Sequence, residues 1–445
     1  MLQIRRWIIF LGIFILVGCG KAESSSKEDF AKENLPQSEV EKQQIILCSG
    51  AYGEYMKTIV DAYNQESDKY EIIVYQKGEG EDVFAFRNRV QAELSSGEGP
   101  DVLDVYALQN IDFVPYAQKG LLLDLTEFIS RAGEISDKVL DYNRWEGGIY
   151  GMPSSFRLEC LMYVRDLEVD PADWNAQLCM KKVEDSKIPY FCARSKWLKP
   201  QNAGIDILNE LGVGRDGIQL FVDEKNATCD FSGEEFRTML EFAKAHADVE
   251  GTGNDGSKRM LDGEVFFSEK GIGSFRDFWK ASSYCQGEEK YIGYPSPNGE
   301  VYGMEVRGFF VNARTKQEEG VKDFLQFVLS DEVQEKISMD QDGYFPVRMD
   351  ILRKLWADAK KEVKDEGYET DLSGQVLYQP RVMTKEEERI FWHMLEHSAP
   401  VYFQNTVDDI LWEEAGYYFS DEKTAEEVAE TIQNRVGNYL KETQN

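Results

Sequence analysis

QIILCSGAYGEYMKTIVDAYNQ, residues 44–65, passes from one pattern of apolar residues to another within a few positions. Residues 44–48 form a short apolar run, which is typical of a buried β-strand. The glycine-containing residues 49–53 interrupt that run. Beyond them Met56, Ile59 and Tyr63 recur at three- and four-residue spacing and so share one face of a helix. We therefore expect a strand followed directly by an amphipathic helix over residues 54–65.

The same alternation continues to residue 120. Strand-like runs at 70–76 and 101–106 alternate with helical patterns at 83–95 and 111–119, and Gly120 closes the last of these. Short connections in the order βαβαβα predict a parallel sheet with helices on its faces. Ligands of such sheets bind beyond the carboxyl ends of the strands. These ends are residues 48–52, 76–81 and 106–109.

The N-terminus has the pattern of a secretory signal. Arg5 and Arg6 precede the apolar run 7–17, which ends in Gly18 and Cys19. The run has about 11 residues, whereas a membrane-spanning helix needs roughly 20. The sequence LVGC at 16–19 resembles a bacterial lipobox, which implies a signal peptide at 1–18 and a lipidated Cys19. An ordinary signal peptide with a Cys by chance and a single-span anchor are the alternatives.

Composition narrows the function classes. The chain has 445 residues, 42% of them hydrophobic, which suffices for sizeable cores. Its formal net charge of -31 repels nucleic acid and anionic lipid headgroups, so we expect neither as a partner. Residues 20–43 are polar and indicate a flexible tether. The cysteines other than Cys19 show no C-x-x-C spacing, which argues against a zinc cluster and leaves open whether they form disulfides or free thiols.

A series of short motifs resembles the bacterial extracellular solute-binding proteins, the family that includes maltodextrin-binding protein. The motifs are GEGPDV at 97–102, YAQKGLLLDL at 116–125, GIYGMP at 148–153, LMYVRDL at 161–167, FVNA at 310–313, the segment 320–334, GYFPVR at 343–348 and the tail 413–442. Each motif is short, but they follow the family's order over about residues 44–445. At position 164 this chain has Val where the family usually has Asn.

The resemblance implies an α/β, two-lobed, periplasmic-binding-protein-like fold of type II with a ligand cleft between the lobes. Lobe one would comprise 44–152 and 308–344, and lobe two 153–307 and 345–445, after a tether at 19–43. The chain would cross between lobes near Met152, near Arg307 and near Tyr344. It further implies a monomeric lipoprotein outside the cell membrane that passes a small solute, such as a mono- or oligosaccharide, to ABC permease subunits without any cofactor.

Carbohydrate recognition needs aromatic faces for the sugar ring and planar polar groups for its hydroxyls. Three guanidiniums fall at predicted cleft edges and would suit an anionic glycan by bidentate pairing. Alternatively they pair with Glu79, Glu81, Glu159 or Glu305 and orient a neutral ligand. The predicted ligand-binding residues are Tyr52, Glu79, Glu81, Tyr106, Phe156, Arg157, Phe275, Arg276 and Arg307.

Two further motifs partly match known metal-binding sequences. HMLEH at 393–397 spells the H-x-x-E-H of inverted zinc peptidases, but Pro400 ends the helix soon after it. Residues 338–343 partly resemble a calcium loop, yet Met349 stands where a bidentate Glu is required. We expect neither metal site and no catalytic residue.

Two other functions remain open from the sequence. The same fold could report a ligand to a membrane sensor kinase instead of a transporter. A surface glycosidase or peptidase is the enzyme alternative, because abundant acidic residues make chance carboxylate pairs plentiful.

Overall fold

The structure is a computed structural model. It describes residues 42–49, 54–78, 80–104, 113–193, 202–212, 221–223, 226–248, 256–337, 343–363, 376, 378–400 and 406–443. The predicted signal peptide, Cys19 and all but the last two residues of the tether lie outside these ranges, as do Tyr52, Glu79, Tyr106 and residues 338–342.

The first part of the chain forms the predicted parallel α/β unit. Strand β1 (Gln43–Cys48) pairs in parallel with both β2 (Tyr70–Tyr75) and β3 (Val102–Asp104), and helices α1 (Glu54–Glu66) and α2 (Val83–Ser96) connect them. The expected strand–helix alternation is therefore confirmed to within a few residues at each boundary.

Local capping defines the ends of α2. The carboxylate of Asp82 accepts a hydrogen bond from the Ala85 amide at 3.0 Å, which satisfies one of the unpaired donors at the helix start. At the other end Gly97 adopts a left-handed conformation with φ of 85°, and its N–H donates to the carbonyl of Leu94. This glycine belongs to the GEGPDV motif, so part of that motif is explained by helix termination.

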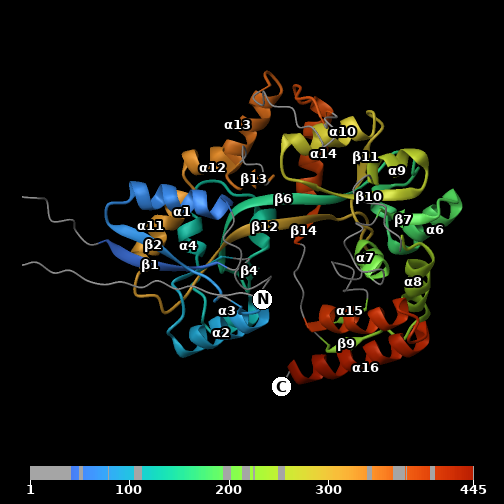
Figure 1. Cartoon of the computed structure of the whole chain (residues 1–445), viewed down its shortest axis with the longest axis horizontal. Coiled ribbons are helices and arrows are strands. Elements are labelled where there is room, and N and C mark those ends of the chain that lie inside the picture. The colour runs from blue at the N-terminus through green and yellow to red at the C-terminus, as the bar shows by residue number, and fades with distance from the viewer. Residues whose placement is uncertain are drawn as a thin grey trace, which may run out of the picture. The chain divides into compact units, whose positions relative to one another are not determined.

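Two long antiparallel strands connect this unit to the rest of the protein (Figure 1). β12 (Tyr302–Val311) pairs with β3 near its carboxyl end and with β6 (Gly151–Tyr163) along most of its length. From Leu158 onward β6 also pairs with β10 (Val265–Ile272), and its last residues pair with β11 (Lys290–Ile292). The strand order is β2-β1-β3-β12-β6-β10-β7, and β7 spans Tyr190–Cys192.

Short strands complete the sheets. β13 (Phe345–Pro346) pairs with β6, and β14 (Ser398–Pro400) pairs with β12. All three predicted interlobe crossings thus fall at or beside strands that pair with one another. The remaining strands are β4 (Arg144–Trp145), β5 (Gly148–Ile149), β8 (Val222–Asp223) and β9 (Thr228–Cys229).

Helices cover the sheet and form the C-terminal part of the chain (Figure 1). They are α3 (Val114–Gln118), α4 (Thr126–Ile129), α5 (Asp137–Asp141), α6 (Ala176–Ser186), α7 (Asn202–Glu210), α8 (Glu234–Ala245), α9 (Gly256–Asp262), α10 (Phe275–Tyr284), α11 (Glu318–Val328), α12 (Asp331–Ile337), α13 (Met349–Ala359), α14 (Lys385–Glu396), α15 (Thr406–Phe419) and α16 (Ala425–Thr443). Among the described residues, none of these helices has the length and apolar character to cross a membrane.

Two large hydrophobic cores lie on this framework. One is built around Phe309 and Trp356 and includes residues of α1, α11, α13 and α14. The other is built around Trp174 and Phe267 and includes residues of α6, α7, α8, α15 and α16. The first core contains residues from both predicted lobes, so the exact lobe boundaries stay a prediction. The six cysteines after Cys19 are all free thiols, which settles the alternative that the sequence left open.

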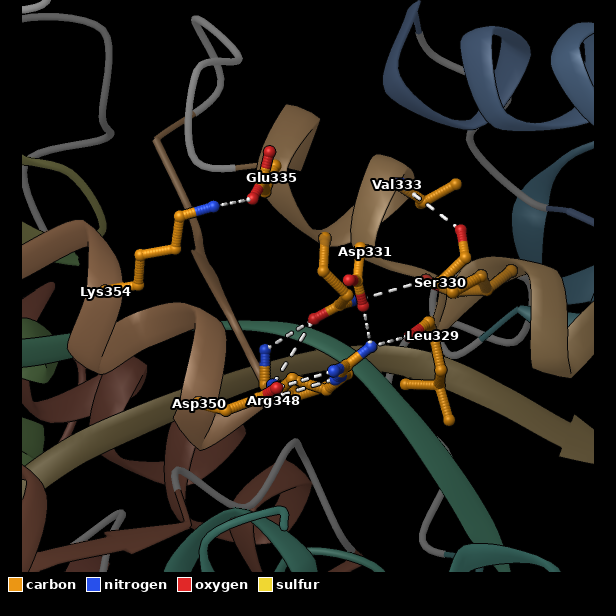
Figure 2. A network of polar contacts seen from close by, with 11 residues as sticks. Leu329, Ser330, Asp331, Val333, Glu335, Arg348, Asp350 and Lys354 are labelled. Carbon is orange, nitrogen blue, oxygen red and sulfur yellow. Dashed lines mark hydrogen bonds and ion pairs between the residues drawn. The ribbon is translucent and has the colours of Figure 1, made fainter. Parts of the chain in front are cut away.

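Buried polar groups fasten the segment that follows α12. The Gln334 side chain, fully buried, donates to the carbonyl of Ser154 on β6 at 3.0 Å and accepts from the Val347 amide at 2.9 Å. Arg348 of the GYFPVR motif lies between Asp331 and Asp350 and also donates to the Leu329 carbonyl at 3.2 Å (Figure 2). These bonds tie β6 and the segment around β13 to the turn between α11 and α12.

Candidate functional site

The candidate site begins with the alternation of side chains along β6. Successive residues of a strand point to opposite faces, so Ser155, Arg157 and Glu159 share one face. The intervening Phe156 and Leu158 are fully buried in the larger core. Polar residues therefore line one face of a central strand, while the other face packs apolar residues.

The pairing register brings β12 onto the same face. Arg157 lies opposite Glu305, and Arg307 lies opposite Ser155. The register shifts between Arg307 and Gly308, where the chain has a β-bulge or irregularity. Such features re-aim side chains beside functional sites. Two cations and two carboxylates are thus concentrated on two adjacent strands.

Arg157 forms ion pairs on both of its sides. Its Nε lies 2.5 Å from Oε2 of Glu305, and its Nη2 lies 3.3 Å from Oε1 of Glu159. The Arg157 side chain is 38% exposed, whereas those of Glu305 and Glu159 are 9% and 14% exposed. Arg157 therefore exposes part of its side chain to solvent, while the two more buried carboxylates of Glu159 and Glu305 neutralise its charge.

Tyr344 joins this cluster from the segment before β13. Its hydroxyl donates to Oε1 of Glu305 at 2.7 Å, and the guanidinium carbon of Arg307 lies 3.6 Å from the centre of its ring. This is a short cation–π contact. Burial raises the pKa of Glu305, and the Tyr344 hydrogen bond and the Arg307 charge act against that rise. Burial likewise raises the pKa of Tyr344.

The carboxyl ends of β1 and β3 contribute a third carboxyl group. Asp104 is the last residue of β3, and the Ser49 hydroxyl at the end of β1 donates to its Oδ2 at 3.1 Å. Burial raises the pKa of Asp104 to about 7, and the Ser49 hydrogen bond and the Arg307 charge partly oppose the rise. Asp104 therefore lies close enough to Arg307 for the Arg307 charge to lower its pKa. It also lies at the carboxyl end of a strand, where ligands of such sheets bind.

Close backbone packing brings the start of α10 to the same place. A Cβ on Gly273 would lie 1.6 Å from the carbonyl oxygen of Gly343, so only glycine fits at position 273. A Cβ on Gly271 would lie 3.6 Å from the Arg157 side chain. The half-buried Asp277 carboxylate accepts from the amides of Gly273 and Ser274 at 2.9 and 2.8 Å and so fixes the first turn of α10. We call Ser49, Asp104, Ser155, Arg157, Glu159, Glu305, Arg307 and Tyr344 the polar cluster.

The structure separates the predicted site residues into groups. Arg157 and Arg307 come together in the polar cluster. Glu81 instead pairs with Arg89, with 2.8 Å between Oε2 and Nη2. Arg276 lies half-buried in the first turn of α10, and its contact with ligand stays a prediction. Tyr52, Glu79 and Tyr106 lie outside the described residues.

Both phenylalanines of the predicted site pack toward the core. Phe156 has no exposed surface and its ring lies against Phe345, so its contact with ligand stays a prediction that the burial of the side chain does not favour. Its neighbours on both sides point to the opposite face of the strand. Phe275 is half-buried, and its ring contacts Trp356 with 4.9 Å between ring centres. A stacking role for Phe275 stays a prediction.

Four members of the polar cluster were predicted neither as ligand-binding residues nor as partners of the arginines, and these are Ser49, Asp104, Ser155 and Tyr344. Ser49 falls in the predicted strand end 48–52, and Asp104 falls in the predicted strand 101–106. The rule that ligands bind at strand ends therefore points to both residues. Tyr344 was named only as a crossing point. Its contact with Arg307 depends on the packing of segments that are distant in sequence.

The H-x-x-E-H motif has a structural explanation. Nε2 of His393 lies 2.7 Å from Oε1 of Glu300, and Nδ1 of His397 bonds the His393 carbonyl oxygen at 2.9 Å. The described ranges contain no group of three His, Cys, Asp or Glu side chains that could hold a metal ion. Residues 338–342 of the partial calcium loop are outside those ranges.

The architecture is that of the two-lobed α/β binding proteins, with strands running between two α/β parts and a polar cluster on those strands. Residues 58–366 match the family described as bacterial extracellular solute-binding protein. The chain belongs to this family. No curated protein sequence matches it.

Solved structures share the fold at low sequence identity. An ABC substrate-binding protein from Listeria monocytogenes in complex with cycloalternan is 16% identical, with a TM-score of 0.56 over 90% of this chain and 99% of that chain. A solute-binding protein from Thermotoga lettingae bound with alpha-D-tagatose is 14% identical, with a TM-score of 0.55 over 90% and 100%. The sugar-binding protein MalE from Xanthomonas citri is 13% identical, with a TM-score of 0.56 over 90% and 98%.

Proposed function

We propose that this protein captures a carbohydrate at the polar cluster and delivers it to the permease of an ABC importer. The observation that carries the proposal is the position of the cluster. It lies on β6 and β12, the strands that connect the α/β parts, and at the carboxyl ends of β1 and β3. The carbohydrates named as bound in two structures of this fold, cycloalternan and alpha-D-tagatose, support the choice of solute class.

In this proposal residues 44–152 and 308–344 form lobe one, and residues 153–307 and 345–445 form lobe two. The cluster then lies at the base of the interlobe cleft. A solute held there contacts groups from both lobes, so its binding favours the closed arrangement by hinge motion. The solute is released unaltered, because the role of the cluster is to bind and not to transform it.

The proposal also places the protein at the outer face of the cell membrane. The family is extracellular, and a lipid on Cys19 would anchor the folded part through the tether at 19–43. Metabolic labelling with a fatty-acid analogue tests the anchor, because Cys19→Ala should abolish the label. A labelled Cys19→Ala variant would refute this part of the proposal.

Substitution of Arg157 tests the binding site. Arg157→Ala removes a charge-assisted donor that is partly exposed, so we expect the affinity for the bound saccharide to fall by about 1–3 kcal/mol. Isothermal titration calorimetry measures the loss, after a thermal-shift screen of mono- and oligosaccharides has found the ligand. The matched control is Arg353→Ala, because Arg353 forms a two-bond ion pair with Glu134 outside the cluster.

The control and the melting temperature separate a binding defect from a folding defect. Arg353→Ala should bind with wild-type affinity. Unchanged affinity in Arg157→Ala would remove the polar cluster from the ligand site. A screen in which no saccharide raises the melting temperature would refute the carbohydrate assignment.

A further inference from the structure

The polar cluster is electrically balanced. Arg157 forms ion pairs with the carboxylates of both Glu159 and Glu305, and the charge of Arg307 also acts on Glu305. Asp104 adds a further carboxyl group beside Arg307. Among the described residues of the cluster, the two arginines are therefore matched by the two glutamates, before Asp104 is considered.

An anionic ligand would disturb this balance. A carboxylate or sulfate that bound Arg157 would approach Glu305 and Glu159, which are mostly buried and cannot move away into water. Like charges at such short range cost several kcal/mol. Displacing Glu305 from Arg157 would instead leave a buried carboxylate without its cation, which is also unfavourable.

A hydroxyl group fits the same surface without these costs. A hydroxyl accepts one hydrogen bond and donates another, so it can accept from a guanidinium and donate to an adjacent carboxylate. Arg157 and Glu305 stand directly opposite each other on β6 and β12, and they present such an alternation. Vicinal hydroxyls of a sugar have the spacing to use it.

The ring of Tyr344 is not available as a stacking platform here. Arg307 covers it at 3.6 Å, and only 4% of Tyr344 is exposed. This part of the site therefore recognises its ligand through polar groups. The guanidiniums and their partner carboxylates determine which ligand binds.

We infer that the solute presents an uncharged polyhydroxy face to the polar cluster, and that Glu305 and Glu159 exclude uronates and sulfated sugars. This inference rests on the proposed carbohydrate-binding function and selects one of the two ligand classes that the sequence left open. Glu305 is then a specificity-determining residue, because it neutralises Arg157 before any ligand arrives.

The test compares matched neutral and anionic sugars on the full-length chain in detergent. The probes are glucose with glucuronate, galactose with galacturonate, and short oligomers of each, measured by thermal shift and then by calorimetry. The neutral member of the pair that binds should have at least about ten-fold higher affinity than its uronate. Tighter binding of the uronate would overturn the inference and leave carbohydrate binding intact. Binding of neither class would refute the proposed function, and the inference with it.

Isosteric variants test the role assigned to the carboxylates. Glu305→Gln keeps an oxygen that can accept the Tyr344 hydroxyl but removes the charge, so the preference for the neutral sugar should shrink by about ten-fold. Glu159→Gln should shrink it in the same direction and serves if Glu305→Gln does not fold. The control is Glu134→Gln, which makes the same charge change beside Arg353 and should leave the preference unchanged. An unchanged preference in the folded cluster variants would overturn the assignment.

Discussion

At the scale of single residues, Asp104 links the site to the stability of the fold. Burial raises the pKa of its carboxyl group from 3.8 to about 7. The folded protein therefore holds a proton that the unfolded chain releases between these values. Stability from this group is complete below pH 3.8 and is lost as the pH rises toward and through 7.

Asp104→Asn should remove this pH dependence. The amide keeps an acceptor for the Ser49 hydroxyl and carries no charge, so the variant should gain stability relative to the wild type as the pH rises from 5 to 8. Since the raised pKa lies near 7, about two pH units of linkage fall within this range, and the gain is about 3 kcal/mol. Urea denaturation at both pH values measures it. A difference in unfolding free energy that is the same at pH 5 and pH 8 would contradict the raised pKa of Asp104.

At the scale of elements, the contact between Gly273 and Gly343 decides how α10 approaches β13. The Gly343 carbonyl oxygen occupies the space that a Cβ at position 273 would need. Gly273→Ala must therefore shift either the start of α10 or the segment before Tyr344. We expect a loss of unfolding free energy on the order of 1–3 kcal/mol, together with weaker ligand binding, because Tyr344 follows Gly343 directly.

Gly416 provides the matched control for that substitution. It lies within α15, and a Cβ there would meet nothing within 4 Å. Gly416→Ala should raise the unfolding free energy by about 0.5–1 kcal/mol, since Ala favours a helix interior over Gly. Denaturant unfolding and calorimetry of both variants measure the two effects. If Gly273→Ala matched Gly416→Ala in stability and affinity, the close contact would have no structural role.

The elements also show what the sequence alone could predict. Strand and helix positions from β1 to α3 follow from local periodicity, so they agree with the structure. The polar cluster depends on pairing between residues about 150 positions apart, such as Arg157 with Glu305. Local pattern gives no such register. The burial of Phe156 next to Arg157 was also not foreseen, since one step along a strand reverses the face to which a side chain points.

At the scale of the whole molecule, the proposed lobes are connected by β6 and β12, which pair with each other along most of the length of β12. Gln334 holds β6 to the segment around β13 from a fully buried position. If the proposed lobes move, we expect this buried contact to stay intact, because breaking it would leave polar groups buried without partners. The irregularity between Arg307 and Gly308 lies within β12, beside the polar cluster.

Ligand binding should close and stabilise the protein together. Small-angle X-ray scattering should show a smaller radius of gyration when the saccharide is present, because closure brings the lobes nearer. At a ligand concentration of 100 times Kd, the unfolding free energy should rise by about 2.7 kcal/mol. Arg157→Ala should need a proportionally higher concentration for both effects. A stabilised protein whose radius of gyration stayed constant would mean that the polar cluster binds its solute without any hinge motion.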